Sequence, residues 1–171
     1  MLKFSLNNIK KNIASVGVIA VLVTIDQVIK YYVVTLLKPI ETHAFIPGFI
    51  QLHYLENDGA MMGFMGGKTE IMTVASLICM IIVILLLFTD FVKSKIVYIC
   101  IVMIAAGGIG NIIDRLIRGF VVDYIEYLFM DFYIFNFADC LITVGVFALI
   151  IYQIALTVRE YKEKKGHAQN D

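Results

Sequence analysis

Four long apolar runs, separated by more polar segments, dominate the chain. They cover roughly residues 13–37, 71–88, 96–113 and 137–158. Each has about the 17–25 residues that an α-helix needs to cross the hydrocarbon core of a bilayer. The first run is too long for a cleaved signal peptide, and no small-x-small cleavage site follows it. The pattern therefore predicts four transmembrane helices, the first of them a retained anchor.

The two long segments between these runs have different patterns. In residues 38–68, Pro39 and Pro47 exclude a continuous helix, residues 49–55 are rich in strand-favouring types, and residues 57–59 are a turn signal. We expect a small antiparallel sheet there, resting on the outer membrane face. Residues 114–136 are expected to form an outer loop. Its aromatic stretch, residues 124–135, predicts a short amphipathic element lying in the membrane interface, with Tyr and Phe as anchors.

Basic residues are concentrated in three of the five segments outside the apolar runs. These are Lys3, Lys10 and Lys11 at the start, Lys93 and Lys95 in the middle, and Arg159, Lys162, Lys164 and Lys165 at the end. The other two segments carry only Lys38, Lys68, Arg115 and Arg118. Because cytoplasmic loops carry the excess of Lys and Arg, both termini are predicted to be cytoplasmic. The tail after residue 159 is expected to be frayed.

Composition supports a membrane protein. The 171 residues are 60% hydrophobic and have a mean hydropathy of +0.86, whereas soluble domains are about half apolar. We expect one integral membrane domain over residues 1–171, all-α with a small β part. A formal net charge of zero gives no case for nucleic acid. Cys79, Cys100 and Cys140 lie in apolar runs, so no disulfide, metal or cofactor is predicted.

Polar residues that are energetically costly to place in a membrane all fall at one depth of the predicted topology, near the outer leaflet. Ionisable residues inside a membrane usually mark function. Within each helix the spacings of three and four place them on one face. The set comprises Asp26 and Lys30 in the first helix, Asn111, Asp114 and Arg115 in the third, Asn136 and Asp139 at the fourth, and Asn57 and Asp123 in the outer segments.

Several of these residues also have purely structural interpretations. Asp26 and Lys30 can be a structural ion pair, and Asn136 can be the N-cap of the fourth helix. The Asn57–Gly59 segment can be only a turn. The glycines around position 110 can be a close helix-packing face.

For Asp123 and Asp139 a structural role is the weakest interpretation, because no base nearby in sequence neutralises Asp139. Two close carboxylates that share a proton can act as acid and base, which is the chemistry of an aspartic protease. Motifs for serine nucleophiles do not occur in the sequence, and no Cys–His pairing is suggested.

Five motifs in order along the chain resemble the lipoprotein signal peptidase (signal peptidase II) family. They are Asp26-Gln27-Val28-Ile29-Lys30, Asn57-Asp58-Gly59-Ala60, Gly110-Asn111-Ile112-Ile113-Asp114-Arg115, Gly119-Phe120-Val121-Val122-Asp123-Tyr124 and Phe135-Asn136-Phe137-Ala138-Asp139. The resemblance implies an aspartic endopeptidase of the bacterial inner membrane with its active site at the outer leaflet. Such enzymes remove the signal peptide of a prolipoprotein just before a cysteine that carries diacylglycerol. It also implies four membrane helices, an outer β-cradle and a small interfacial helix.

By the same resemblance, Asp123 and Asp139 would be the catalytic pair. Supporting or substrate-binding residues would be Asp26, Lys30, Asn57, Gly59, Asn111, Asp114, Arg115, Asn136 and Ala138. The partners implied are diacylglyceryl-modified prolipoproteins, membrane lipid and the inhibitor globomycin. The chain departs from the family pattern at Met62, where an aromatic residue is common. A flexible Met there is expected to make the flap beside the cradle more adaptable.

Two other classes of function use similar residues. A proton-coupled carrier also needs intramembrane acids, but carriers tend to hold substrate at the bilayer midplane between repeats. The sequence shows no repeat, and its polar residues gather near one face. A non-enzymatic assembly factor would tolerate Asp123→Asn and Asp139→Asn. A monomer is expected, because one chain supplies both aspartates.

Overall fold

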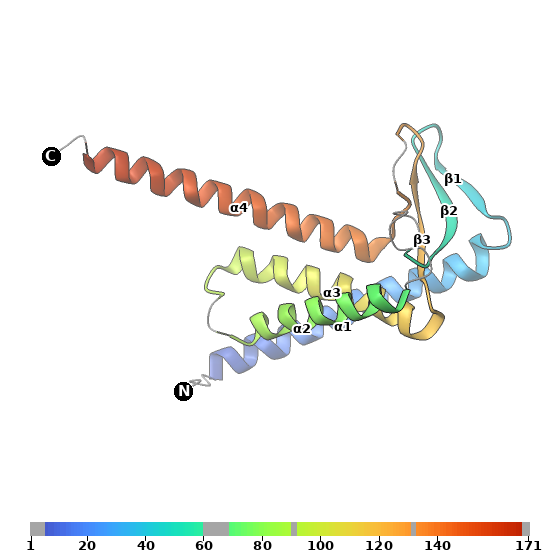
Figure 1. Ribbon diagram of the computed structural model, residues 1–171, viewed down its shortest axis with the longest axis horizontal. Helices are drawn as coiled ribbons and strands as arrows, with labels where there is room; N and C mark the ends of the chain where they lie inside the picture. The colour runs from blue at the N-terminus through green and yellow to red at the C-terminus, as the bar shows by residue number, and fades with distance from the viewer. Residues whose placement is uncertain (1–5, 60–68, 90–91, 131–132, 169–171) are drawn as a thin grey trace.

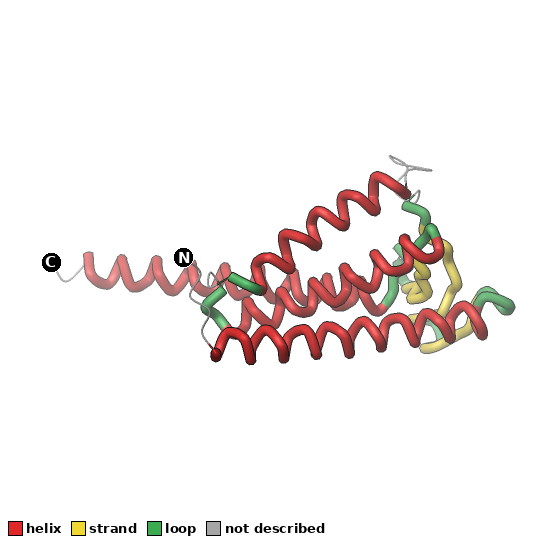
Figure 2. The backbone as a smooth tube through the Cα atoms, turned by 90° about the horizontal axis from the view of Figure 1, so that it is seen from below, coloured by secondary structure: helices red, strands yellow, loops and turns green. Residues whose placement is uncertain are grey.

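The computed structural model describes residues 6–59, 69–89, 92–130 and 133–168. Three of its long helices lie side by side, the last helix starts beside them and diverges toward the C-terminus, and a small sheet sits at the end where the last helix begins (Figure 1). In chain order the elements are α1 (Leu6–Tyr32), η1 (Val33–Leu37), β1 (Thr42–Ile46), β2 (Ile50–Asn57), α2 (Thr69–Leu87), α3 (Lys95–Arg118), β3 (Val121–Tyr127) and α4 (Phe137–Ala168). Figure 2 shows the strands and the loops that join them at this same end.

Helix α3 is the centre of the bundle and contacts each of the other three long helices. It is the only candidate span among the described residues with more than half of its apolar window buried. Small residues along its middle, Ala105, Ala106 and Gly107, allow the close helix approach that is common in membranes. Near its N-terminal half, Tyr98 and Ile101 of α3 form an apolar cluster with Met80 of α2.

Three of the described helices are long and apolar enough to cross a membrane. The candidate spans are Lys11–Leu37, Lys95–Arg118 and Phe137–Lys165. The expected second span lies in α2, whose apolar part, Thr73–Leu87, is shorter than the other three. The protein is therefore mainly helical, and the fourth membrane crossing and the orientation of the chain stay predictions.

Helix α3 has defined ends that lead the chain into the sheet. The side chain of Ser94 accepts a hydrogen bond from the Val97 backbone, which caps the first turn. Gly119 ends the helix in the left-handed conformation, with φ 82°, and donates its backbone N–H to the Arg115 carbonyl. A residue with a Cβ would be strained there. The chain then reverses directly into β3.

The sheet is antiparallel with strand order β1-β2-β3. The first two strands lie in the predicted segment 38–68, but the third comes from residues 121–127, where a loop with a short amphipathic element was expected. The loop prediction is wrong for residues 121–127, and the short interfacial helix that the resemblance implied does not form at residues 124–127. β-branched and aromatic residues favour strands, and Val121 and Val122 pair with Asn57 and Glu56 of β2. Pairing with β2 therefore outweighs the aromatic pattern that suggested an interfacial element.

The last helix is longer than the apolar run that predicted it. α4 continues to Ala168, so the tail that was expected to be frayed is helical through that residue. An ion pair between Arg159 and Glu163, one turn apart at 2.8 Å, supports this extension. The expectation about Met62 falls in residues 60–68, outside the part of the chain that is described.

Candidate active site

Asp123 and Asp139 lie on different elements that meet beside the sheet. Asp123 is the third residue of β3 and is 1% exposed, while Asp139 is half-buried in the first turn of α4. Before α4 starts, Phe135 pairs with Ile125 of β3 through hydrogen bonds of 2.7 and 3.1 Å. This pairing returns the chain to β3 and brings the first turn of α4 next to Asp123.

Asn136 links the two aspartates. Its side-chain Nδ2 donates to Oδ1 of Asp123 at 2.6 Å, and its backbone N–H donates to Oδ2 of Asp139 at 3.2 Å. Its Oδ1 accepts the backbone N–H of Asp139 at 2.9 Å, which caps α4. Asn136 therefore serves both as a helix cap and as a bridge.

Two further asparagines each donate to one of the aspartates. Nδ2 of Asn57 donates to Oδ2 of Asp123 at 2.8 Å, and Nδ2 of Asn111 donates to Oδ1 of Asp139 at 2.7 Å. Every oxygen of both carboxylates thus accepts a hydrogen bond. Gly59, with φ 87°, closes a turn by donating its backbone N–H to Oδ1 of Asn57 at 2.9 Å. That turn fixes which end of the Asn57 amide faces Asp123.

A buried cation lies on the α1 side of this network. Lys30 is fully buried and pairs with Asp26 and with Asp114, each at 2.9 Å. It also donates to Oδ1 of Asn111 at 3.0 Å, and the same oxygen accepts Nδ2 of Asn136 at 3.1 Å. With two donors at its oxygen, the Asn111 amide must point its nitrogen toward Asp139.

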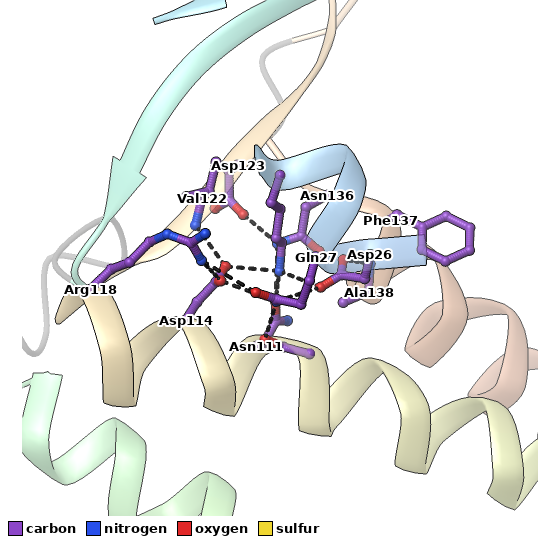
Figure 3. Close-up of polar contacts among 12 residues, drawn as sticks. Asp26, Gln27, Asn111, Asp114, Arg118, Val122, Asp123, Asn136, Phe137 and Ala138 are labelled. Atoms are coloured by element: carbon purple, nitrogen blue, oxygen red, sulfur yellow. Dashed lines mark hydrogen bonds and ion pairs between the residues drawn. The ribbon is translucent and has the colours of Figure 1, made fainter. Parts of the chain in front are cut away.

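The two partners of Lys30 also hold the backbone next to each catalytic candidate. Asp26 accepts the backbone N–H of Ala138, and Asp114 accepts that of Val122, at 3.1 and 3.2 Å. Ala138 and Val122 are the residues immediately before Asp139 and Asp123. One buried ion cluster therefore positions both ends of the site, as Figure 3 shows for most of these residues.

Close packing between α1 and α3 depends on Gly110. A Cβ added at this position would lie 2.6 Å from Oδ2 of Asp26. The sequence suggested that Gly110 is a packing residue and that Asp26 is a site residue. The structure shows that the two residues pack against each other.

Two residues of the network were not singled out from the sequence. The Gln27 amide nitrogen lies within 3.2 Å of Asp26, Asp114 and the Gly110 carbonyl, and Arg118 forms an ion pair with Asp114. The sequence did contain a signal for each of them. Gln27 is a polar residue beside Asp26 in an apolar run, and Arg118 is a base four positions after Asp114. Both brace the acids rather than contact Asp123 or Asp139.

Arg115 is placed differently from the other predicted residues. It is partly buried in the last turns of α3 and is close enough to interact electrostatically with Asp139, Asp123 and Asp114. A guanidinium in this position can contact either the aspartates or a substrate carbonyl.

Burial changes the proton affinity of Asp123. Removal from water, which disfavours the charged form, is the main cause that raises the pKa of this carboxyl to about 7, and the charge of Asp139 adds to it. The hydrogen bonds from Asn57 and Asn136 oppose the shift without cancelling it. Near neutral pH, Asp123 can therefore be present in its protonated form.

Known proteins resemble this chain over most of its length. A family model described as signal peptidase (SPase) II matches residues 18–155. A lipoprotein signal peptidase of Enterococcus faecalis is 40% identical over 147 residues, which is 86% of this chain and 91% of that protein. One from Streptococcus pneumoniae is 36% identical, over 83% of this chain and 93% of its own.

A solved structure has the same fold. It is a bacterial membrane enzyme determined by the in meso method at 2.3 Å resolution, with a TM-score of 0.76 and 33% identity, covering 84% of this chain and 89% of that one. The resemblance inferred from the five motifs is confirmed, and so is the prediction of a membrane protein. The chain belongs to the signal peptidase II family and is a membrane protease.

Proposed function

We propose that the protein removes the signal peptide from diacylglyceryl-modified prolipoproteins, cutting immediately before the lipidated cysteine. The catalytic groups would be Asp123 and Asp139, which act as an aspartate dyad on a water molecule. The observation that carries this proposal is the pair of hydrogen bonds from Asn136, one to each aspartate, because they hold two carboxylates from separate elements beside one another.

Peptide hydrolysis by such a pair needs one ionised and one protonated carboxyl. The ionised carboxylate takes a proton from water as the oxygen attacks the scissile carbonyl carbon. The other carboxyl donates its proton, which reaches the departing amide nitrogen when the carbon–nitrogen bond breaks. A pKa of about 7 suits Asp123 to the role of proton donor.

The surrounding residues have supporting roles in this proposal. Asn57, Asn111 and Asn136 orient the carboxylates, and Lys30 with its two acids fixes the backbone that carries them. Arg115 is the group best placed to bind a substrate carbonyl, since it is charged and lies within electrostatic reach of both aspartates.

The proposal also gives the protein a place in the cell. The distribution of Lys and Arg supports cytoplasmic termini, so that the site lies at the outer leaflet of the bacterial cytoplasmic membrane. A signal peptide helix can present its end there while the acyl chains of the substrate stay in lipid. One chain supplies both aspartates, so a monomer suffices, and we expect globomycin to inhibit the protein.

The experiment that tests the dyad is cleavage of a diacylglyceryl-modified prolipoprotein by purified protein in detergent. Wild type, Asp123→Asn and Asp139→Asn are compared, and Glu163→Gln on the exposed end of α4 is the matched control. We expect each aspartate variant to lose activity by about 10²–10⁴-fold, as for other acid–base groups. The control should cleave at the wild-type rate.

Melting curves of all four proteins show whether each one is folded. Cleavage that persists in a folded aspartate variant removes that aspartate from the mechanism. Failure of the folded wild type on a good substrate would contradict the proposed activity.

A further inference from the structure

The free end of the sheet is apolar and exposed. We call it the sheet tip and define it as residues 45–50, at the turn between β1 and β2, with residues 127–130, at the end of β3. No residue in either segment is charged. Six of its large apolar side chains are between 44% and 64% exposed: Phe45, Ile46, Phe49, Leu128, Phe129 and Met130. Exposed apolar groups gathered in this way mark a surface that contacts a protein or a membrane.

The sheet tip is ordered by contacts of its own. The backbone N–H of Leu128 donates to the Phe49 carbonyl at 3.0 Å. The rings of Phe49 and Phe129 stack with centroids 4.6 Å apart, and Tyr127 lies 5.3 Å from Phe129. These contacts join the β1–β2 turn to the end of β3, so the apolar surface is built by two separate segments of chain.

The sheet tip projects sideways from the helices. Figure 1 shows the strands running across the direction of α4, so that the sheet tip ends to one side of the bundle, near the level where α4 begins. In Figure 2 the whole sheet is confined to that end of the bundle. In a membrane that contains α1, α3 and α4, this direction places the sheet tip over the lipid that surrounds the helices.

Charged groups of the sheet lie outside the tip. Lys38 pairs with Glu56 near the opposite end of β2, and Glu126, which His53 contacts at 2.8 Å, directly precedes the tip residue Tyr127. The sheet is thus polar toward the bundle and apolar at its free end. Such a gradient fits an element that meets the headgroup boundary of a bilayer with one end.

We propose that the sheet tip inserts into the outer interface of the membrane in which the protein resides, as a second anchor beside the helices. The partner is the lipid surface itself. Aromatic side chains suit this boundary, where one part of the ring is apolar and its surroundings are wet. The inserted tip fixes the height of β3, because Tyr127 and Asp123 lie on the same strand, four residues apart.

The sequence offers a direct test because it contains no tryptophan. Phe129→Trp places a single fluorophore in the part of the sheet tip that follows β3, and Phe45→Trp places one in the part that belongs to β1. Phe147→Trp, at an exposed site within the apolar run of residues 137–158, is the membrane control. Tyr161→Trp, at an exposed site beyond that run and among the charged residues 159–165, is the aqueous control. Each protein is reconstituted into phosphatidylcholine vesicles with bromine on the acyl chains.

We expect the tryptophans at 129 and 45 to be quenched by lipids brominated near the headgroup, several times more strongly than the tryptophan at 161. Aqueous iodide should quench them weakly. Quenching by iodide and not by lipid would overturn the proposal, because the sheet tip would then lie in water. Protection from both quenchers would also overturn it, because another protein surface, such as a second copy of the chain, would then cover the tip.

A functional test builds on the proposed protease activity. The double variant Phe45→Ser/Phe129→Ser should raise the apparent KM for a bilayer-embedded prolipoprotein by about tenfold, through lost apolar contact with lipid. The kcat should stay near the wild-type value, because neither residue touches the aspartates. The fluorescence result does not require activity, so failure of the proposed function and failure of the anchor can be told apart. An unchanged KM together with iodide quenching would reject the anchor alone.

Discussion

Asn136 concentrates three functions in one side chain. It caps α4, donates to Asp123 and shares the Asn111 oxygen with Lys30. A cap alone could be supplied by serine, whereas the bridge needs an amide that both donates and accepts. The cap and the bridge can therefore be separated by substitution.

We predict that Asn136→Ser keeps most of the stability and loses at least about 10²-fold in kcat, because the capping oxygen remains while the donor to Asp123 is lost. Asn136→Ala should lose the same activity and about 1 kcal/mol more stability than the serine variant. Rates on lipidated substrate and thermal melts measure both effects. Asn12→Ala is the control, because Asn12 lies at the end of α1 away from the site. A serine variant with wild-type kcat would contradict the bridging role.

A second prediction concerns pH. The folded state raises the pKa of Asp123 from its ordinary value of 3.8 to about 7, so it binds more protons than the unfolded state between these values. The contribution of this group to the free energy of unfolding therefore falls as pH rises from about 4 to 7, and it does not change further above pH 7. Asp123→Asn should be more resistant to heat than wild type at pH 8, by roughly 5 °C or more, but not at pH 4.

Thermal melts in detergent at both pH values provide this measurement. Glu41→Gln, an exposed carboxylate before β1, is the control and should follow the wild type. Parallel pH dependence in wild type and Asp123→Asn would show that Asp123 is not the group that links stability to pH.

Helix α3 packs closely against α4 where α3 carries a glycine. A Cβ at Gly107 would overlap the Ala138 carbonyl of α4 and lie 2.8 Å from Cγ1 of Ile142. Gly17 in α1 is the opposite case, because nothing lies within 4 Å of its added Cβ. Helical glycine is thus required at one position and dispensable at the other.

Gly107→Ala should therefore lower stability by about 1–3 kcal/mol through overpacking. It should also reduce kcat, because the displaced Ala138 precedes Asp139. Gly17→Ala should be neutral or slightly stabilising, as expected for alanine in an open helical position. Denaturation curves of both variants provide the comparison. Equal effects at the two positions would contradict the assigned α3–α4 contact.

The elements also show what a sequence can and cannot specify. The long apolar runs predict the helices because bilayer thickness sets a minimum length. The third strand could not be predicted, because residues 121–127 become a strand by pairing with β2, more than sixty positions earlier in the chain. The chemistry proposed for Asp123 and Asp139 follows from their residue types. Their positioning by Asp26 and Asp114 could not be inferred, because those bonds go to backbone N–H groups, which every sequence has.

At the scale of the whole molecule, the proposed depth of the site bears on which substrates would reach it. Asn111 of α3 donates to Asp139 of α4, Asp26 of α1 binds the neighbouring Ala138 backbone, and the sheet lies at this same end of the helices (Figure 1). In the proposed function, a substrate anchored in the same membrane by acyl chains would be delivered to this level, whereas a free peptide would have to be captured from water.

We therefore predict that removal of the acyl chains from the prolipoprotein weakens its binding, by an upper guide of about 0.8 kcal/mol for each CH₂ withdrawn from lipid. The kcat should change much less than KM, because the scissile bond is unaltered. Steady-state kinetics on matched precursors, with and without diacylglycerol, test this. Equal cleavage of the two precursors would contradict a membrane-delivered substrate.

The separation of Asp123 and Asp139 on a strand and on the last helix has a consequence for biogenesis. A nascent chain that has not yet emerged past residue 136 carries only the first of the two aspartates, and lacks the Ala138 backbone that Asp26 binds. The proposed chemistry, which needs both carboxyls, could thus begin only once the final helix has been inserted. The order of the residues along the chain would then keep the protease latent throughout its own synthesis.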